Sequence, residues 1–398
     1  MKESALVVTT NKWNWLVGGL ALVTLLVITW TFYQHTVWAG PVMSAGVSDS
    51  GRYVITTHRN NELILWDIES KDWKTVHTKA NLYSASFVPG KHAFVWQDLT
   101  DQVTVQTIDG ERLLRFPHFA TYGHTISEDL NTYLSTDENW NVFKGSGANL
   151  KPILQDGISP SFEGSGKLLN LSMAREGNFF VTSGFGDDIA PIEDYPPVDQ
   201  ERRFSRYSGV TFWNAETGKP IAKFQGNTAK THAVISPDGK WIISGDENGN
   251  GFYWDTSAPE ERYRLANYYS GIYIDDTPFD MGDARNWDKE GLIDAPQGLN
   301  DFTIAQAFIH NSEYYLRFGN NSHIAALFKA GSPWPVKYFD LGESPELVTY
   351  GSNYSRNTAI ATSPEAGVLV MGHRTGGGIS VYHFDADNLT LNRTWVVE

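Results

Sequence analysis

One short segment carries oxygen-bearing side chains at the spacing of a metal-binding loop. Asp246, Asn248 and Asn250 alternate with other residues, and a glycine follows. This order matches the first half of a calcium-binding loop, in which carboxylate and amide oxygens surround the ion. Ser257 stands at the twelfth position, where such a loop needs a bidentate glutamate. Asn and Gly also accept the positive φ of a hairpin turn, so we expect a turn and no cofactor, with bound calcium as the alternative.

The sequence lacks the motifs of the common enzyme classes. Its 11 histidines include no HExxH pair, and no paired spacing typical of a metal site. The G-x-S-x-G, P-loop and G-x-G-x-x-G orders are also missing. With no cysteine, the chain has no disulfide, thiolate metal ligand or cysteine nucleophile. We therefore predict no catalytic and no metal-ligating residues.

Two segments, residues 187–207 and 266–300, combine acidic, basic and aromatic side chains. Arg, Tyr and Trp anchor protein interfaces, because they offer a large contact area together with polar groups. We therefore predict that both segments bind a protein partner. The alternatives are solvated acidic loops packed on their own domain, or a calcium site formed by the clustered aspartates. The predicted contact residues are Asp187, Asp188, Asp194, Tyr195, Arg202, Arg203, Arg206, Tyr268, Tyr269, Tyr273, Asp276, Phe279 and Trp287.

Composition limits the class of protein that must position these segments. The 398 residues are 41% hydrophobic and 13% aromatic, which is enough to pack a core and excludes wholesale disorder. The net charge of −15 argues against nonspecific nucleic-acid binding, which needs a basic surface. We expect no nucleic-acid partner.

The N-terminal region reads as a membrane span. Residues 13–33 are uncharged and apolar, with aromatic residues at both ends, and about twenty such residues cross a bilayer. Lys2 and Lys12 precede the run, which places residues 1–12 in the cytoplasm and everything after the span outside, in the periplasm of a Gram-negative cell. We predict a single transmembrane helix over 13–33 and a linker over 34–41. The alternative is a signal peptide cleaved after Ala39.

The rest of the chain repeats a unit of about forty residues. Residues 48–70, SDSGRYVITTHRNNELILWDIES, and 236–257, SPDGKWIISGDENGNGFYWDTS, share one order. Each has a Ser-x-x-Gly turn, an alternating apolar strand, a polar turn, a second strand and Trp-Asp. With weaker copies, about seven units are present once the two inserted segments are set aside. Such a unit of four strands cannot bury both its faces alone, so copies must stack, and a closed ring removes the exposed ends.

This unit resembles the WD40 repeat family, most clearly over residues 236–255 and 61–67. The resemblance implies an all-β fold, a seven-bladed β-propeller over residues 42–398, preceded by the transmembrane helix. It also implies a role in binding partners, which is what propellers of this family mostly do. The Asp that the family has before its third strand is replaced by Asn60 and Asn248, and the Gly-His dipeptide is not at its usual offset in the two best units. We therefore do not expect the side-chain network that those residues make within a blade.

Topology predicts where the inserted segments lie. Strands alternate in direction within a blade, so the connections from second to third strand share one face with the connections between blades. Residues 187–207 fall in the first kind of connection and residues 266–300 in the second, so both should project from the same face. The first strand begins near Val42 on that face, after a link too short to reach far, so we expect the inserted segments to face the membrane.

The function that the sequence favours is a membrane-anchored, extracytoplasmic scaffold in an envelope or membrane complex, with a membrane-associated protein partner and no enzymatic activity. One alternative is a propeller hydrolase or lyase that acts on an envelope glycan or small ester. Another is a module that binds a small ligand or a glycan. Convergent carboxylates with Arg or His at the channel mouth would favour an enzyme, and an apolar or plugged channel would oppose one.

Overall fold

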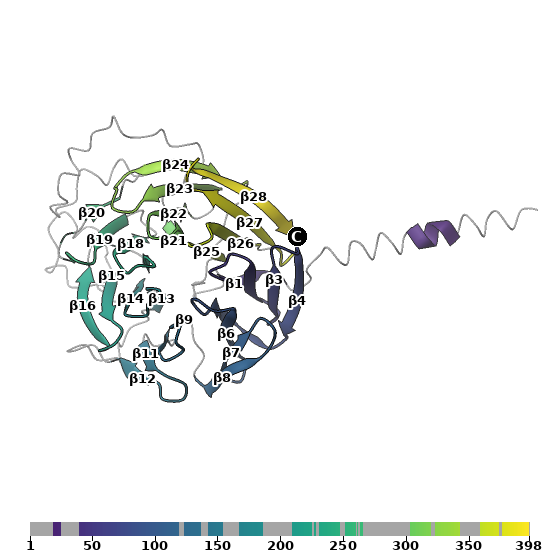
Figure 1. Ribbon diagram of the computed structural model, residues 1–398, viewed down its shortest axis with the longest axis horizontal. Coiled ribbons are helices and arrows are strands. Elements are labelled where there is room, and N and C mark those ends of the chain that lie inside the picture. Colours follow the sequence, from purple (N-terminus) through teal and green to yellow (C-terminus); the bar gives the residue numbers. More distant parts are fainter. Residues whose placement is uncertain are drawn as a thin grey trace, which may run out of the picture.

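The chain folds into seven four-stranded sheets arranged as a closed ring (Figure 1). This computed structural model describes residues 19–24, 40–118, 123–136, 142–153, 167–185, 209–224, 227, 231–246, 251–259, 261, 263–265, 303–319, 323–342, 359–373 and 376–397.

Each sheet is one blade, and each takes four consecutive strands that pair antiparallel. The first blade is β1 (Val42–Val47), β2 (Tyr53–His58), β3 (Leu63–Asp67) and β4 (Asp72–His77). The second is β5 (Ala80–Phe87), β6 (Ala93–Asp98), β7 (Gln102–Thr107) and β8 (Arg112–Pro117), and the third is β9 (Gly123–Ile126), β10 (Tyr133–Thr136), β11 (Val142–Gly145) and β12 (Lys151–Ile153).

The fourth blade is β13 (Lys167–Met173), β14 (Phe179–Phe185), β15 (Gly209–Asn214) and β16 (Lys219–Phe224). The fifth is β17 (Thr231–Ile235), β18 (Trp241–Asp246), β19 (Gly251–Asp255) and β20 (Tyr263–Arg264). The sixth is β21 (Thr303–His310), β22 (Tyr314–Gly319), β23 (Ile324–Lys329) and β24 (Pro335–Asp340), and the seventh is β25 (Ile360–Ser363), β26 (Val368–Gly372), β27 (Ile379–Asp385) and β28 (Thr390–Val397). The predicted seven-bladed β-propeller is thereby confirmed.

Position within a blade explains the residue pattern of each strand. The first strand of each blade lies toward the ring axis and the fourth lies at the rim (Figure 1). The middle strands are covered on both faces by neighbouring blades, so β6, AFVWQD, is buried along its whole length. The rim strand β4, DWKTVH, has no fully buried residue. The strands that flank the turn expected at Asn248, β18 and β19, pair antiparallel, while residues 247–250 themselves lie outside the described residues.

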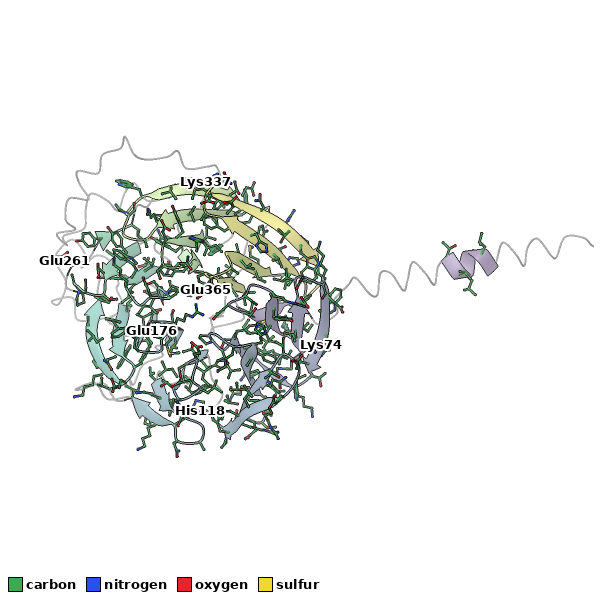
Figure 2. The ribbon with its side chains drawn as sticks, in the orientation of Figure 1. Lys74, His118, Glu176, Glu261, Lys337 and Glu365 are labelled. Atoms are coloured by element: carbon green, nitrogen blue, oxygen red, sulfur yellow. The ribbon has the colours of Figure 1, made fainter. Side chains whose placement is uncertain are left out.

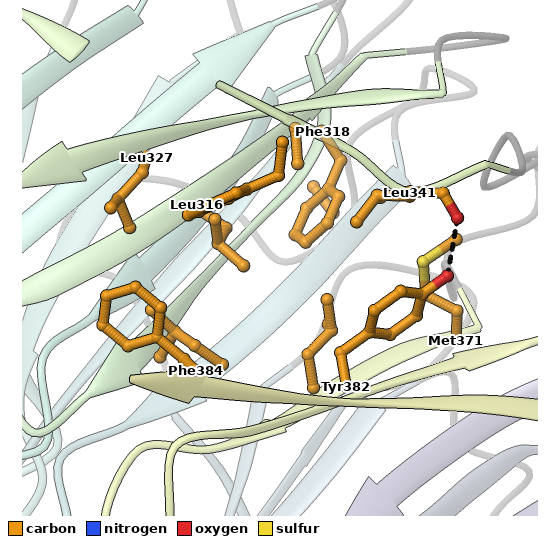
Figure 3. Close-up of a cluster of buried hydrophobic side chains, with 12 residues drawn as sticks. Leu316, Phe318, Leu327, Leu341, Met371, Tyr382 and Phe384 are labelled. Carbon is orange, nitrogen blue, oxygen red and sulfur yellow. Dashed lines mark hydrogen bonds between the residues drawn. The ribbon is translucent and has the colours of Figure 1, made fainter. Parts of the chain in front are cut away.

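A hydrophobic cluster fills each junction between neighbouring blades. Figure 3 shows the cluster between the sixth and seventh blades, where Leu316, Phe318 and Leu327 face Met371 and Phe384. In the same cluster the hydroxyl of Tyr382 donates to the backbone oxygen of Leu341 at 2.8 Å, which satisfies a buried phenol (Figure 3). Burying large apolar side chains between sheets is the main force that holds such a ring closed.

The ring closes without exchange of strands, because β1 pairs within the first blade and β28 pairs within the seventh. The chain itself crosses every other junction, so the junction of the first and seventh blades, which we call the seam, is the one place without a peptide link. At the seam the backbone N–H of Val42 donates to the oxygen of His373 at 3.0 Å. The seam's apolar cluster includes Val42, Val47, Val54, Ile64, Trp66, Val368, Val370, Ile379, Val381 and Val397, with Trp73 and Trp395 packed against it.

Candidate functional site: the two faces of the ring

The predicted partner-binding residues all lie outside the described residues, since they fall within 186–208 and 266–302. The strands that flank both segments are described, however, and they fix where each segment leaves the ring. β14 ends at Phe185 and β15 begins at Gly209, so the first segment joins the second and third strands of the fourth blade. The second joins Leu265, after β20, to β21 and so connects the fifth and sixth blades. Both predicted placements are confirmed.

Two further long connections were not predicted. Residues 154–166 join β12 to β13, and residues 341–359 join β24 to β25. Both run from the fourth strand of one blade to the first strand of the next. All four long connections therefore start and end on one side of the ring, which we call the loop face. β1 also begins there.

The opposite side, the turn face, carries the short connections from first to second and from third to fourth strands. The turns between first and second strands touch their neighbours around the ring. Gly90 packs against Glu128, and Gly177 packs against Ser127. A Cβ added at Gly90 would overlap the side chain of Glu128, and one added at Gly177 would lie 3.0 Å from the Cβ of Ser127. The remaining neighbours are joined by hydrogen bonds: Gly90 N–H to Asp49 Oδ2, Arg175 N–H to Pro237 O, Asp238 N–H to Ser312 Oγ, Asn311 N–H to Pro364 O, and Ser363 Oγ to Asp49 O. We call this closed circuit the turn belt.

One arginine spans the middle of the turn belt. Arg175, in the fourth blade, places Nη1 2.8 Å from Glu365 Oε1 in the seventh blade and Nη2 3.2 Å from Asp49 Oδ2 in the first. The fourth blade neighbours neither of these, so the side chain must reach across the ring axis. Figure 2 shows Glu365 near the middle of the ring. These three residues, which we call the ion triad, lie near the centre of the turn face.

The ion triad carries two carboxylates for one guanidinium. Burial raises the pKa of Glu365, and the nearby carboxylate of Asp49 raises it further, although Arg175 acts in the opposite direction. Convergent carboxylates and an arginine are the arrangement that the enzyme alternative required. Here they pair with one another, as structural ion pairs do. Among the residues that the structure describes, no group of three or more His, Asp and Glu is placed to hold a metal ion.

The first blade contains a buried polar chain that starts at Trp66. The indole Nε1–H donates to Thr56 Oγ1 at 2.8 Å, and Thr56 Oγ1 lies 2.7 Å from His58 Nε2. His58 Nδ1 lies 3.0 Å from the backbone oxygen of Gly40. A carbonyl oxygen only accepts, so Nδ1 carries the proton and Nε2 accepts from the threonine hydroxyl. This arrangement needs a neutral imidazole, and burial lowers the pKa of His58 to about 4.

Partial copies of this chain recur in other blades. In the fourth blade Trp213 Nε1 donates to Thr182 Oγ1 at 2.9 Å. In the fifth, Ser244 Oγ donates to Asn227 Oδ1 at 2.9 Å. In the third, His118 Nε2 bonds to Ser135 Oγ. The expectation that blades lack such a network was therefore wrong in part, because Asn227 and His118, just beyond the preceding blade, supply partners that the sequence pattern did not reveal.

The N-terminal span is described only over residues 19–24, which are helical. Leu20 is 72% exposed, and Leu22 and Val23 are also exposed. Within the described residues, no helix is both long enough and apolar enough to cross a membrane. The rest of residues 13–33, and with it most of the predicted span, lies outside that part of the chain.

Comparison with known proteins supports the fold. Residues 218–255, which run from β16 to β19, match the WD domain, G-beta repeat of the WD40 family. The ring is a seven-bladed β-propeller in which one segment matches the WD40 repeat. The β-propeller domain of Cps50 (Swd1) from Myceliophteria thermophila is similar in structure, with a TM-score of 0.55 and 10% sequence identity over 87% of this chain and 97% of that one. At that identity the likeness extends to the fold alone. No curated protein matches the chain in sequence.

Proposed function

We propose that this chain is a membrane-anchored, extracytoplasmic β-propeller that acts as a protein-interaction scaffold in an envelope or membrane complex. The fold supports a scaffold role, since WD40 propellers typically present rigid surfaces to partners. One observation carries the proposal further: all four long connections leave the loop face, whereas the described connections of the turn face are short. Long loops on a rigid framework are where proteins usually place recognition.

The two faces also differ in how their polar groups are used. On the turn face, the backbone and side chains between first and second strands bond to neighbouring turns, and the charged groups of the ion triad pair with one another. A surface whose polar groups are already paired has less to offer a partner than one built from long loops. The loop face, with segments 187–207 and 266–300, is therefore the face that we assign to the partner.

The apolar run at residues 13–33 supports the membrane part of the proposal, together with Lys2 and Lys12 before it. Because β1 starts on the loop face, an anchor ahead of it would bring that face toward the bilayer. A partner that meets this surface would then be membrane-associated.

Affinity purification of the full-length protein from detergent extracts, with mass spectrometry of the co-eluting proteins, tests the scaffold role. In one variant, residues 187–207 and 266–300 are replaced by short Gly/Ser turns. In a matched control, residues 146–149 in the turn-face connection between β11 and β12 are replaced in the same way. We expect a stoichiometric membrane protein that is lost with the first variant and kept with the control. Elution of the protein alone at native expression would contradict the proposal.

The anchor is tested separately by fusing a reporter that is active only outside the cytoplasm to the C-terminus. We expect activity from the full-length fusion, and sedimentation of the fusion with membranes that carbonate washing does not reverse. An expressed full-length fusion without reporter activity would refute the extracytoplasmic placement without bearing on the scaffold role. Release of the fusion into the soluble fraction, with a new N-terminus after Ala39, would identify a cleaved signal peptide.

A further inference from the structure

The seam is the junction of the ring that most needs additional support. Its two blades are not joined by a peptide link, and no strand crosses it. Every other junction is tethered by the chain, so two separating blades there remain at high effective concentration. At the seam, separation of the first and seventh blades is opposed only by packing and polar contacts between them and by whatever reaches them from elsewhere in the ring.

The ion triad reaches both sides of the seam. Asp49 belongs to the turn between β1 and β2 on one side, and Glu365 belongs to the turn between β25 and β26 on the other. A single guanidinium from the opposite side of the ring contacts both, at 3.2 Å and 2.8 Å. Two like charges facing each other across an untethered junction would repel, so the arginine converts a repulsive pair into an attractive group.

The turn that holds Asp49 makes further contacts with other blades. The backbone oxygen of Asp49 accepts a hydrogen bond from the hydroxyl of Ser363, and its carboxylate accepts one from the N–H of Gly90. The turn that holds Asp49 thus bonds to the second blade, to the seventh blade and, through Arg175, to the fourth. The backbone N–H of Arg175 is itself fixed to Pro237 in the fifth blade at 2.9 Å, which anchors the base of the side chain.

We propose that Arg175 is a clasp for the seam: one guanidinium, held from the far side of the ring, keeps the first and seventh blades together by pairing with Asp49 and Glu365. The clasp is electrostatic and partly exposed, with side-chain exposures of 41% for Arg175, 30% for Asp49 and 24% for Glu365. Its contribution is therefore modest and sensitive to salt. It acts on opening of the ring and not on the packing of any single blade.

Hydrogen–deuterium exchange of the full-length protein tests the clasp, because the N–H of Val42 bonds across the seam and reports its opening directly. The variant is Arg175→Met. Arg52→Met is a matched control, since Arg52 also pairs with two carboxylates, Asp67 and Glu69, but within the first blade. For Arg175→Met we expect exchange to rise about two- to thirtyfold in peptides that cover β1 and β25–β26, the range for losing two partly exposed ion pairs. Peptides from the fifth blade should not change, and Arg52→Met should leave the seam unchanged.

Two more measurements make the outcome decisive. Arg175→Lys keeps the charge but lacks the fork that serves two carboxylates, so it should fall between the wild type and Arg175→Met. Sodium chloride at 1 M should raise seam exchange in the wild type but not in Arg175→Met, where it instead screens the repulsion between Asp49 and Glu365. If Arg175→Met does not fold, the same readout is taken on Asp49→Asn and Glu365→Gln. An increase confined to the fourth blade, an equal increase in the Arg52→Met control, or no increase at the seam would each overturn the proposal.

Discussion

The buried polar chain of the first blade gives a prediction whose size can be worked out from the structure. Thr56 is fully buried and bonds to two groups, the Nε1–H of Trp66 and the Nε2 of His58. Thr182 in the fourth blade is also buried but is bonded to one such group, the Nε1–H of Trp213. Replacing either threonine by valine keeps the shape and removes the hydroxyl. The two substitutions therefore differ in how many buried polar groups each leaves without its partner.

Each buried group that loses its partner costs about 1–3 kcal/mol. Thr182→Val should lower the free energy of unfolding by about that amount, because it affects one indole N–H. Thr56→Val affects an indole N–H and an imidazole nitrogen, so it should cost about 1–3 kcal/mol more. The measurement is urea unfolding followed by circular dichroism at pH 7.5, where His58 is neutral. Tryptophan fluorescence is avoided as the only probe because the substitutions alter the surroundings of Trp66 and Trp213.

A double-mutant cycle then isolates the histidine. In a His58→Phe background, Thr56→Val should cost about as much as Thr182→Val, because one of the two stranded groups has been removed. The reasoning is refuted if Thr56→Val and Thr182→Val have equal effects in the wild-type background. It is also refuted if the coupling between positions 56 and 58 is below about 0.5 kcal/mol, the level at which independent sites add.

Two further predictions concern the pH dependence of stability and the effect of two Gly→Ala substitutions. Burial lowers the pKa of His58, His124 and His232 to about 4 each. Unfolding therefore takes up protons below pH 6.5, and the free energy of unfolding should fall as the pH drops from about 6.5 to about 4. Unfolding midpoints measured between pH 7.5 and 5 should show this slope, and His124→Gln should reduce it; a flat profile would contradict the assignment. Gly377→Ala should destabilise more than Gly110→Ala, since both have positive φ but only at Gly377 would a Cβ lie 2.6 Å from a backbone oxygen. Thermal melting of the two variants decides this, with equal losses as the contrary result.

Much of the fold could be predicted because its determinants are local. The Ser-x-x-Gly turn, the apolar alternation and the Trp-Asp ending all recur within about forty residues, so counting copies gives the number of blades. The last copy ends in TLNRTWVV, which forms the rim strand β28. The insertions at 187–207 and 266–300 were recognisable as breaks in this period. Residues 154–166 and 341–359 were missed because they adjoin the weakest copies, where the period itself is faint.

The ion triad could not be predicted in the same way, because its members lie far apart in sequence and meet only at the ring axis. Glu365 is 190 positions from Arg175. A signal did exist: Asp49 and Arg175 directly follow the first residue of equivalent turns, Ser48 and Ala174. The N–H of each of these first residues donates to the backbone oxygen five positions further along the chain. Aligning the turns of all units would have placed an acid and an arginine at one level around the axis.

The way the ring is assembled bears on how such a protein can be rearranged. Each blade is encoded by one uninterrupted stretch of sequence, so a gene could be cut between any two blades and rejoined end to end without breaking a single ladder of paired strands. The present start of the chain is then one of seven interchangeable starting points. What the choice of starting point determines is which blade carries the N-terminal segment, and therefore how the ring is rotated relative to whatever that segment is attached to.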